Sequence, residues 1–580
     1  MTDSNFDLAI IGLGPRGHFA LERFIEEVSR QDVPGAARIL LFEETEQLGN
    51  GPVWDTSQSD SNWSNVNERI LELPARPKID LGDALIEGFP SYHDWSDYDP
   101  IGTPSSEPDH YPPRNLIGAY LHQRFNTLLS SLSSHGIAQL VRERVDEVAV
   151  GEPGLRVTTR SGASYSADQV LLAVGHQSTR HDTQIEGWQA EIEPLDRLRL
   201  FADPYPVEPI VNLATPEENT YIAIRGYGLA TIDIVRSIAE AHGSFTRRDE
   251  LSNDLMFTLT KKGSLNLIPF SLDGLPMGPK PISEELDSQF APVKTELEEL
   301  GQKLGDPELQ KRASGKAFLL DALVPVIGKV FRALDHKFDG APSDRQAFHQ
   351  LITAWIDDPT QDHKCFLDTG QPPIEFLKNL VQMADGTAPI SLDYCIGQVW
   401  RHCHPTIYKA LSHGALKDDV LAEVIFTDEA MKRYAFGPPA EGLRQLIALH
   451  EAGVLTLDFV ADPEIAVTEQ GWILTSEDKH ATAQFMVNAV LDAPKIADVC
   501  TPLIERLLQD GLLAPVHNDL GVATTEDGYA ISMDGSILPI AVLGRLAKGT
   551  IVGVDAMLEC FGDRPRSWAI RALQRLNPAQ

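Results

Sequence analysis

The hydrophobic pattern at the start of the chain predicts a strand, a glycine-rich turn, a helix and a second strand. An apolar run at 8–11 leads into Gly-Leu-Gly-Pro-Arg-Gly at 12–17. Apolar residues then recur at helical spacing over 21–28, and a second apolar run at 38–42 ends at Glu43. An acidic residue at this point, after strand, glycine turn and helix, is typical of a nucleotide-binding unit.

A similar pattern returns after a proline-rich linker. An apolar run at 221–224 leads into Gly-Tyr-Gly at 226–228, followed by a predicted helix over 229–242 and a predicted strand at 256–260. The pattern is mainly helical from about residue 283 to residue 453. Further strand-like runs follow at 455–460, 472–475, 485–491 and 537–542.

These elements predict an α/β protein with two Rossmann-like dinucleotide-binding domains and a mainly helical insert. The first part of an FAD-binding domain is expected at 1–210 and its closing part at 454–580. The core of an NAD(P)-binding domain is expected at 211–282, and the helical insert at 283–453.

Composition narrows the possible partners. The 580 residues include 84 acidic and 49 basic side chains, a formal net charge of −35. This charge repels nucleic-acid phosphates and anionic lipids, so we expect neither as a partner. The five cysteines are scattered without a Cys-x-x-Cys pair, which disfavours disulfides and thiolate zinc sites. No signal peptide or apolar run of about 20 residues is visible, so we expect a cytoplasmic protein; the oligomeric state is open.

The first glycine turn carries specific chemistry. Gly12 permits a tight turn, Gly14 lets a pyrophosphate approach the backbone, and Gly17 lets helix and strand pack closely. The helix amino end adds unpaired N–H groups and a positive dipole. Glu43 is the residue type that accepts hydrogen bonds from an adenosine ribose. We therefore predict that these four residues bind a dinucleotide.

Several other segments resemble a known family. They are Leu48–Trp54, Trp63–Val66, Tyr111–Leu121, Leu171–His176, Phe436–Pro439 and Leu543–Gly549. Together they resemble the FAD/NAD(P)-binding flavoproteins, a family that includes FAD-dependent urate hydroxylase and the nitrosuccinate-forming aspartate N-monooxygenase. The resemblance covers nearly the whole chain and is less sharp over about 283–430.

The resemblance implies an FAD-dependent monooxygenase that consumes NAD(P)H, with molecular oxygen and a small polar nitrogen-containing metabolite as its substrates. The length of the chain is closer to the aspartate N-oxygenating branch, which favours oxygenation of an amine. Trp54 and Asn65 are candidate FAD contacts, although a tryptophan is more often part of the core. Two alternatives stay open: a flavin-dependent reductase or dehydrogenase without productive oxygen transfer, and a noncatalytic nucleotide-binding protein.

The second glycine turn favours a nicotinamide nucleotide. Gly226 and Gly228 are kept, whereas Thr231 stands where the third glycine normally lies, so the turn is also compatible with a former site that only packs. Lys261 and Lys262 follow the next predicted strand, where an NAD site has an acid. Two cations there would pair with a 2′-phosphate and favour NADPH, unless they are simply solvated loop charges.

An acidic substrate would need arginines, which bind carboxylates with two parallel hydrogen bonds. Arg114, Arg401 and Arg433 are the candidates, and each is also compatible with a structural ion pair. His402 and His404 flank a cysteine, but their spacing gives poor joint geometry and no third ligand is evident, so we expect no metal. No catalytic side chain is assigned, because flavin chemistry is mostly the cofactor's own.

Overall fold

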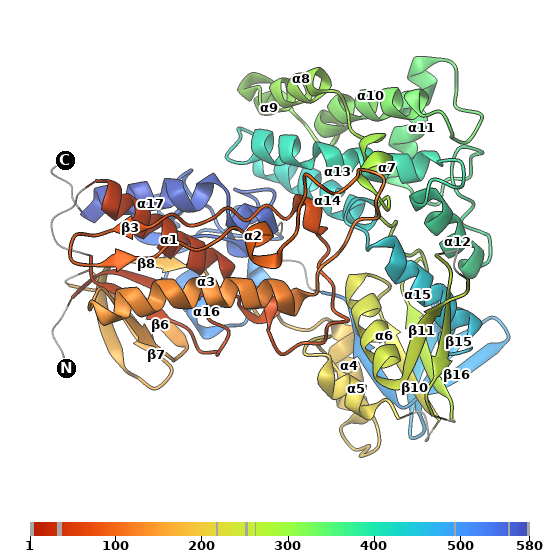
Figure 1. The fold of residues 1–580 in the computed structure, drawn as a ribbon, viewed down its shortest axis with the longest axis horizontal. Helices are drawn as coiled ribbons and strands as arrows, with labels where there is room; N and C mark the ends of the chain where they lie inside the picture. The colour runs from red at the N-terminus through yellow and green to blue at the C-terminus, as the bar shows by residue number, and fades with distance from the viewer. Residues whose placement is uncertain are drawn as a thin grey trace.

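The structure is a computed structural model that describes residues 5–31, 37–152, 154–215, 219–249, 253–261, 263–491, 495–554 and 557–576. Lys262 lies outside the described residues. Figure 1 shows three parts: a sheet covered by helices at the left, a second sheet at the lower right, and a group of helices at the upper right. The mixed α/β class predicted from the sequence is confirmed. The described helices include none long and apolar enough to cross a membrane.

Strands from both ends of the chain build the first sheet. In the order in which they lie side by side, its main strands are β18 (Tyr529–Ile531), β19 (Ile537–Val542), β8 (Ser164–Leu172), β1 (Phe6–Ile11), β2 (Ile39–Phe42) and β5 (Ala138–Val141). From β19 to β5 the neighbouring strands are parallel. An antiparallel hairpin of β6 (Val145–Val150) and β7 (Leu155–Thr159) extends from β8. Strands near the carboxyl end thus complete a sheet that begins at residue 6.

The central strand β1 is buried on both faces, as expected for a parallel sheet covered by helices. Leu8 and Ile10 belong to the same apolar cluster as residues of three helices: α1 (Pro15–Arg30), α3 (Arg114–Ser134) and α17 (Asp563–Leu576). Ala9 and Ile11 belong to the opposite cluster, with α16 (Pro502–Gln509). Since successive strand residues point to opposite faces, this alternation fixes β1 between two helical layers.

The second sheet draws its strands from distant parts of the chain. Its parallel strands lie in the order β13 (Leu265–Phe270), β10 (Thr220–Arg225), β17 (Phe485–Asn488) and β9 (Arg199–Phe201). The expected domain boundaries at 210 and 454 are therefore corrected, because they cut this sheet. Both β9 and β17 are too short to reveal their pairing partners from the sequence.

The two faces of the second sheet are covered differently. One face packs against α5 (Glu208–Leu213), α6 (Leu229–His242) and the helical insert. The other packs against α4 (Thr183–Ile192) and an antiparallel sheet of β14 (Glu464–Thr468), β15 (Gly471–Ser476) and β16 (Lys479–Ala483).

The strand after α6 does not join the second sheet, which corrects the sequence-based expectation. Among the described strands, β12 (Leu255–Leu259) pairs with β11 (Gly243–Arg247) alone, in an antiparallel ribbon. In β12, Phe257 is buried and Met256 is exposed, the alternation of a strand covered on one face. β13 takes the place beside β10 instead. Lys261 therefore precedes β13 and is exposed. It lies at the amino ends of the parallel strands, whereas the second glycine turn lies at their carboxyl ends.

The segment from 283 to 453 contains helices and no strand, and all of it is described. Its helices are α7 (Glu284–Ser288), α8 (Lys294–Leu304), α9 (Pro307–Arg312), α10 (Ala317–Ala333), α11 (Arg345–Asp357), α12 (Pro373–Ala384), α13 (Leu392–Leu411), α14 (Asp418–Ala435) and α15 (Ala440–Glu451). The strand predicted at 455–460 is wrong, because Leu455 makes a single isolated bridge to Leu267 of β13 and the segment forms no strand. The short elements β3 (Ile79–Asp80), β4 (Leu85–Ile86) and α2 (Tyr92–Ser96) lie between β2 and α3.

Candidate functional site

In the first glycine turn, two of the three glycines are required by packing. Gly12 has a φ of +90°, and a Cβ there would lie 2.6 Å from the carbonyl oxygen of Ala173. A Cβ on Gly17 would overlap the carbonyl oxygen of Gly12. β1, the turn and α1 therefore approach each other as closely as the sequence motif predicts.

Gly14 differs, because neither its conformation nor its packing requires a glycine. Its φ of −66° is open to any residue, and α1 begins immediately after it without a side-chain cap. A Cβ on Gly14 would meet only the Cα of Gly51, at 3.8 Å. A side chain at Gly14 would therefore meet little protein, and backbone N–H groups and the helix dipole favour an anion at the amino end of α1. Such room beside the second glycine is what the approach of a pyrophosphate requires.

Glu43 stands beside the same turn. One carboxylate oxygen accepts a hydrogen bond from the Leu13 N–H at 2.9 Å. The other accepts from the N–H of Thr45 at 3.0 Å and from its hydroxyl at 2.9 Å. The carboxylate is therefore held at the end of β2 next to the turn, where it can also accept hydrogen bonds from ribose hydroxyls. The four residues predicted for this site lie together and fit FAD.

Trp54 and Asn65 make contacts of a structural kind. Trp54 is half-buried against an apolar cluster of α1 and α3. The Asn65 amide donates to the carbonyl oxygen of Phe436 at 2.9 Å, and its oxygen accepts from the Lys280 ammonium at 2.5 Å. Asn65 thus joins the first domain to the end of the helical insert. Its assignment as an FAD contact, and that of Trp54, stay predictions.

Lys280 closes this junction from the second domain. Besides the Asn65 side chain, its ammonium donates to the carbonyl oxygens of Asn65 at 2.8 Å and Gly437 at 2.7 Å. Burial and the nearby Arg401 hold the pKa of Lys280 well below its usual range. Through these three oxygen acceptors, Lys280 links the segment of Asn65 to the segment of Gly437.

In the second glycine turn, hydrogen bonds to and from Gly226 hold the backbone in place. Gly226 has a φ of +123°, and its N–H donates to the Phe270 carbonyl at 2.7 Å. The Thr231 hydroxyl donates to the Gly226 carbonyl at 2.8 Å. Gly228 precedes α6, with only the Met277 sulfur, at 3.7 Å, close to where a Cβ would be. The turn therefore leaves room at the amino end of α6, and this room fits a nucleotide phosphate.

The three arginines predicted to bind substrate are each paired with a different carboxylate. The Arg114 guanidinium contacts Asp233 of α6 at 2.6 Å. Arg401 pairs with Asp287, and Arg433 pairs with Asp273. Each arginine thus forms the structural ion pair that was the alternative to substrate binding. The substrate roles of the three arginines stay predictions.

A cavity lies where the first domain, α6 and the end of the helical insert meet. The first domain contributes Trp63–Asn65 and Arg114, and the insert contributes Pro438, Pro439 and Gly442. The wall from α6 consists of Leu229, Ile232, Asp233 and Arg236. The cavity is small, about 20 Å³, which is room for about one water molecule. Three of the segments that carry the family resemblance therefore meet at one place.

Arg236 was not singled out in the sequence. It is only 2% exposed, and its guanidinium carbon lies 3.5 Å from the centre of the Trp63 ring. The only local signal is a cation among the apolar residues of α6, a pattern that an exposed helix face also produces. Its burial depends on contacts with the first domain, which no local pattern reveals.

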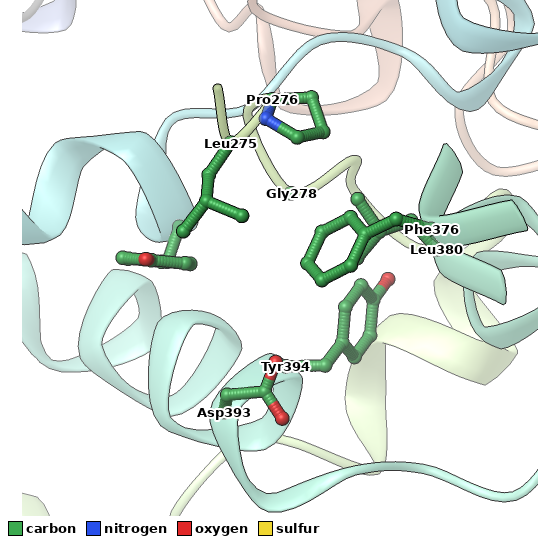
Figure 2. A pocket seen from close by; sticks show the side chains of 8 residues that line it. Leu275, Pro276, Gly278, Phe376, Leu380, Asp393 and Tyr394 are labelled. Carbon is green, nitrogen blue, oxygen red and sulfur yellow. The ribbon is translucent and has the colours of Figure 1, made fainter. Parts of the chain in front are cut away.

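A second cavity lies between the loop after β13 and helices α12, α13 and α14. Figure 2 shows Leu275 and the rings of Phe376 and Tyr394 around it. Asp393 stands at its margin, where it accepts a hydrogen bond from the Leu367 N–H at 3.1 Å. Burial raises the pKa of Asp393. The lining is mainly apolar and belongs to the packing of the insert against the second domain.

The histidines of α13 have separate carboxylate partners. His402 Nε2 lies 3.3 Å from Asp287, and His404 Nε2 lies 3.1 Å from Asp428. Within the described ranges, no group of three histidine, cysteine or acidic side chains is placed to hold a metal ion.

Each of the two glycine turns joins a parallel strand to the helix that follows it, an arrangement typical of dinucleotide-binding units. Residues 9–177 match the family model described as FAD-NAD(P)-binding. That segment is therefore similar to the FAD-NAD(P)-binding family, which confirms the resemblance and the cofactor classes expected from the sequence.

The chain is also similar to several individual proteins. It is 27% identical to nitrosuccinic acid synthase of Aspergillus oryzae over 240 residues. These aligned residues are 41% of this chain and 36% of that protein. It is 23% identical to the uncharacterized Escherichia coli protein YdhS over 94% of this chain and 92% of that one. It is 22% identical to L-aspartate N-monooxygenase (nitrosuccinate-forming) of Streptomyces cremeus, over 88% of this chain and 84% of that one.

Among solved structures, an epsilon-caprolactone-bound cyclohexanone monooxygenase aligns with 99% of this chain and 88% of its own. The TM-score is 0.45 and the sequence identity is 13%. Values this low do not establish a common fold.

Proposed function

We propose that the protein is an FAD-dependent, NADPH-consuming monooxygenase that oxygenates the amine of a small polar metabolite, with an aspartate-like substrate preferred. The observation that carries this proposal is the contact between the two nucleotide units, where Arg114 of the first domain pairs with Asp233 of α6 at 2.6 Å. A reaction of two nucleotides with a third substrate requires such a meeting point, because the reacting groups must be held together. The names of the Aspergillus oryzae and Streptomyces cremeus relatives support the choice of an amine.

The residues of the chain have defined tasks in this proposal. Gly14 leaves room for the FAD pyrophosphate at the amino end of α1, and Glu43 accepts hydrogen bonds from the ribose. Gly228 leaves the corresponding room at the amino end of α6. Bound FAD supplies the redox and oxygen chemistry.

The preference for NADPH needs a cation at the carboxyl ends of the strands of the second sheet, where the glycine turn lies. Lys261 lies at the amino ends of these strands, so it no longer supports the preference. The carboxyl end of β13 lies beside the glycine turn, and Asp273 follows it in a pair with Arg433. The Arg433 side chain is 32% exposed and therefore accessible. We assign the 2′-phosphate to Arg433, because a guanidinium forms two parallel hydrogen bonds with phosphate.

The test uses the purified full-length protein. We expect a yellow protein that takes up oxygen in proportion to NADPH oxidation when L-aspartate is present, and that releases an N-oxygenated product detected by mass spectrometry. NADPH oxidation without any oxygenated amine, across a screen of small amino acids and amines, would indicate a reductase. A colourless protein that does not take up FAD would indicate a noncatalytic nucleotide-binding protein. Either result excludes the proposed function.

A further inference from the structure

One face of helix α6 contacts the first domain through polar side chains. Asp233 and Ser237 lie one helical turn apart, so they belong to the same face of α6. Asp233 pairs with Arg114 at 2.6 Å, and the Ser237 hydroxyl lies 2.8 Å from that of Ser61. The helix that follows the second glycine turn is therefore held against the domain that carries the first.

Arg114 is the centre of this contact, and all three nitrogens of its guanidinium donate. Nη2 donates to Asp233 at 2.6 Å, Nε to the carbonyl oxygen of Trp63 at 3.1 Å, and Nη1 to the Tyr205 hydroxyl at 3.4 Å. The Tyr205 hydroxyl donates in turn to Asp233 at 2.5 Å. Burial opposes the charge of Arg114, but Asp233 and Tyr205 raise its pKa, so the guanidinium remains a cation.

Close packing connects Arg114 to the first glycine turn. Arg114 is the first residue of α3, and one turn further along this helix a Cβ on Gly118 would overlap the carbonyl oxygen of Trp54. The segment that contains Trp54 begins beside the glycine turn, since a Cβ on Gly51 would lie 3.2 Å from the Cα of Gly14. The position of Arg114 is therefore fixed relative to the amino end of α1.

Asp233 provides the corresponding connection in the second unit. It lies in the second turn of α6, roughly 7 Å along the helix axis from Gly228 at a rise of about 1.5 Å per residue. The Arg114–Asp233 pair thus sets where the amino end of α6 lies relative to that of α1. Polar contacts between domains leave relative motion open unless specific bonds hold them, so this pair determines how precisely the two nucleotide units are placed.

We propose that Arg114 is a positioning residue for reduction of the flavin: its pair with Asp233 holds the nicotinamide nucleotide unit against the FAD unit in the arrangement that hydride transfer requires. The proposal rests on the proposed function, because it deepens the account of how NADPH serves that reaction. In this step a hydride passes from NADPH to FAD with its electron pair, so that NADPH is oxidised to NADP⁺ and FAD is reduced to FADH⁻. Positioning takes the place of the substrate contact predicted for Arg114.

The size of the effect follows from the geometry of the transfer. Reacting atoms must lie about 3–3.5 Å apart, and a misplacement of about 1 Å can lower a rate roughly 100-fold. Loss of the ion pair leaves each glycine turn within its own unit unchanged. It should therefore slow the transfer between bound nucleotides without weakening the binding of either one.

The experiment follows anaerobic reduction of the FAD-loaded full-length protein by stopped-flow absorbance over a range of NADPH concentrations. For Asp233→Asn and Arg114→Gln we expect normal flavin content, a Kd for NADPH within about threefold of the wild type, and a limiting rate at least tenfold lower. Asp109→Asn is the matched control. Asp109 pairs with Arg69 at 2.9 Å and its side chain is also 6% exposed, but both residues belong to the first domain. The limiting rate of the control should stay within about twofold of the wild type.

A disulfide across the contact provides a rescue that a general loss of stability would not show. The Ser61 and Ser237 hydroxyl oxygens are 2.8 Å apart, so Ser61→Cys and Ser237→Cys place two thiols within bonding reach. When both are added to Arg114→Gln, we expect oxidation to restore at least half of the wild-type limiting rate and dithiothreitol to abolish the recovery. The yield of the disulfide without NADPH, measured by mass spectrometry, reports docking independently of flavin reduction. It should be lower with Arg114→Gln than with Arg114 in place.

Tyr205→Phe keeps both charges and removes only the hydroxyl that donates to Asp233. It decides the proposal if Arg114→Gln and Asp233→Asn do not fold, and its limiting rate should be at least threefold lower than that of the wild type. The inference is overturned if these variants reduce their flavin at the wild-type limiting rate, if only the Kd for NADPH changes, or if the disulfide restores nothing.

Oxygen uptake separates this inference from the proposed function. If loss of the ion pair slows flavin reduction and the disulfide restores it, but the wild type oxygenates no amine, the positioning role stands and the proposed function fails. If the wild type oxygenates L-aspartate and Arg114→Gln keeps the wild-type limiting rate, the proposed function stands and the positioning role fails. A wild type whose flavin NADPH does not reduce overturns both.

Discussion

The two glycine turns follow the same course from strand to helix, but different contacts hold them. In the first, the third glycine lets α1 approach the Gly12 carbonyl so closely that no side chain fits. In the second, Thr231 replaces that glycine and its hydroxyl donates to the equivalent carbonyl, that of Gly226. A third glycine is thus dispensable where a hydroxyl satisfies the carbonyl, and departure from the glycine pattern at Thr231 does not by itself indicate a lost site.

The two helices that follow the turns also differ in their anchors. Within α1, Glu22 pairs with the buried Arg124 of its own domain at 2.5 Å. Within α6, Asp233 pairs with Arg114 of the other domain, and the Ser237 hydroxyl lies 2.8 Å from that of Ser61. The first site is therefore set by one domain core, whereas the position of the second depends on contact between domains. This contact borders the small cavity lined by Trp63, Arg114 and Arg236.

The largest expected effect comes from the anchor of α1. Glu22→Gln removes one partner of an ion pair whose side chains are both 0% exposed. Leaving Arg124 uncompensated should cost about 3–5 kcal/mol of the free energy of unfolding. Urea denaturation followed by circular dichroism measures this cost. Glu240→Gln on α6, a partly exposed position, is the matched control and should stay within about 0.5 kcal/mol of the wild type.

The same pair predicts a pH dependence. Burial opposes ionisation of Glu22, yet Arg124 lowers its pKa to about 2 from the ordinary value of 4.5. A carboxyl whose pKa is lower in the folded state stabilises the fold above the unfolded value. The contribution should be complete above pH 4.5 and lost as the pH falls through about 2. The acid-induced fall in stability should be shallower in Glu22→Gln, and parallel curves would contradict this role.

Gly17→Ala tests the close approach in the first turn. The added methyl group would overlap backbone that α1 and β1 hold in place, so we expect a loss of about 1–3 kcal/mol together with weaker retention of FAD. Thermal unfolding and the flavin content of the purified protein measure both. Gly187→Ala is the control, since no heavy atom lies within 4 Å of its Cβ position. Equal flavin content in both variants would show that the approach is not required.

Arg433→Gln tests the nucleotide preference of the second unit. Loss of a charge-assisted contact should lower the NADPH-to-NADH ratio of kcat/KM about tenfold, since 1.4 kcal/mol corresponds to a decade. Lys261→Ala should leave the ratio unchanged, because Lys261 lies at the opposite edge of the sheet. The reverse pattern would return the assignment to the lysine.

Thr231→Ala should have the smallest effect. Loss of its hydrogen bond to the Gly226 carbonyl should cost about 1 kcal/mol and weaken NADPH binding, with FAD retained. Thr231→Ser keeps the hydroxyl and should restore both quantities in fluorescence titrations with NADPH. If Thr231→Ser behaves like Thr231→Ala, the methyl group and not the hydroxyl holds the turn.

The sequence predicted the features that depend on neighbours along the chain. The first turn, its helix and Glu43 lie within a span of 32 residues from Gly12, and the structure brings them together. Lys261 was wrongly predicted to lie near the second glycine turn, because the order of strands in a sheet depends on contacts between distant parts of the chain. β12 has the pattern of a strand, but its partner is β11 and not β10. Arg236 was missed because its burial against Trp63 arises only when two domains meet.

The central claim is that the first turn holds FAD and the second holds the nicotinamide nucleotide. Its most direct test is anaerobic flavin reduction by NADPH, followed by absorbance, in the wild type, Gly14→Ala and Gly228→Ala. Each added Cβ meets no protein atom closer than 3.7 Å, so both variants should fold. We predict that Gly14→Ala is purified largely without flavin, and that Gly228→Ala keeps its flavin but is reduced at least tenfold more slowly. Normal flavin content in Gly14→Ala, or reduction of Gly228→Ala at the wild-type rate, would contradict the claim.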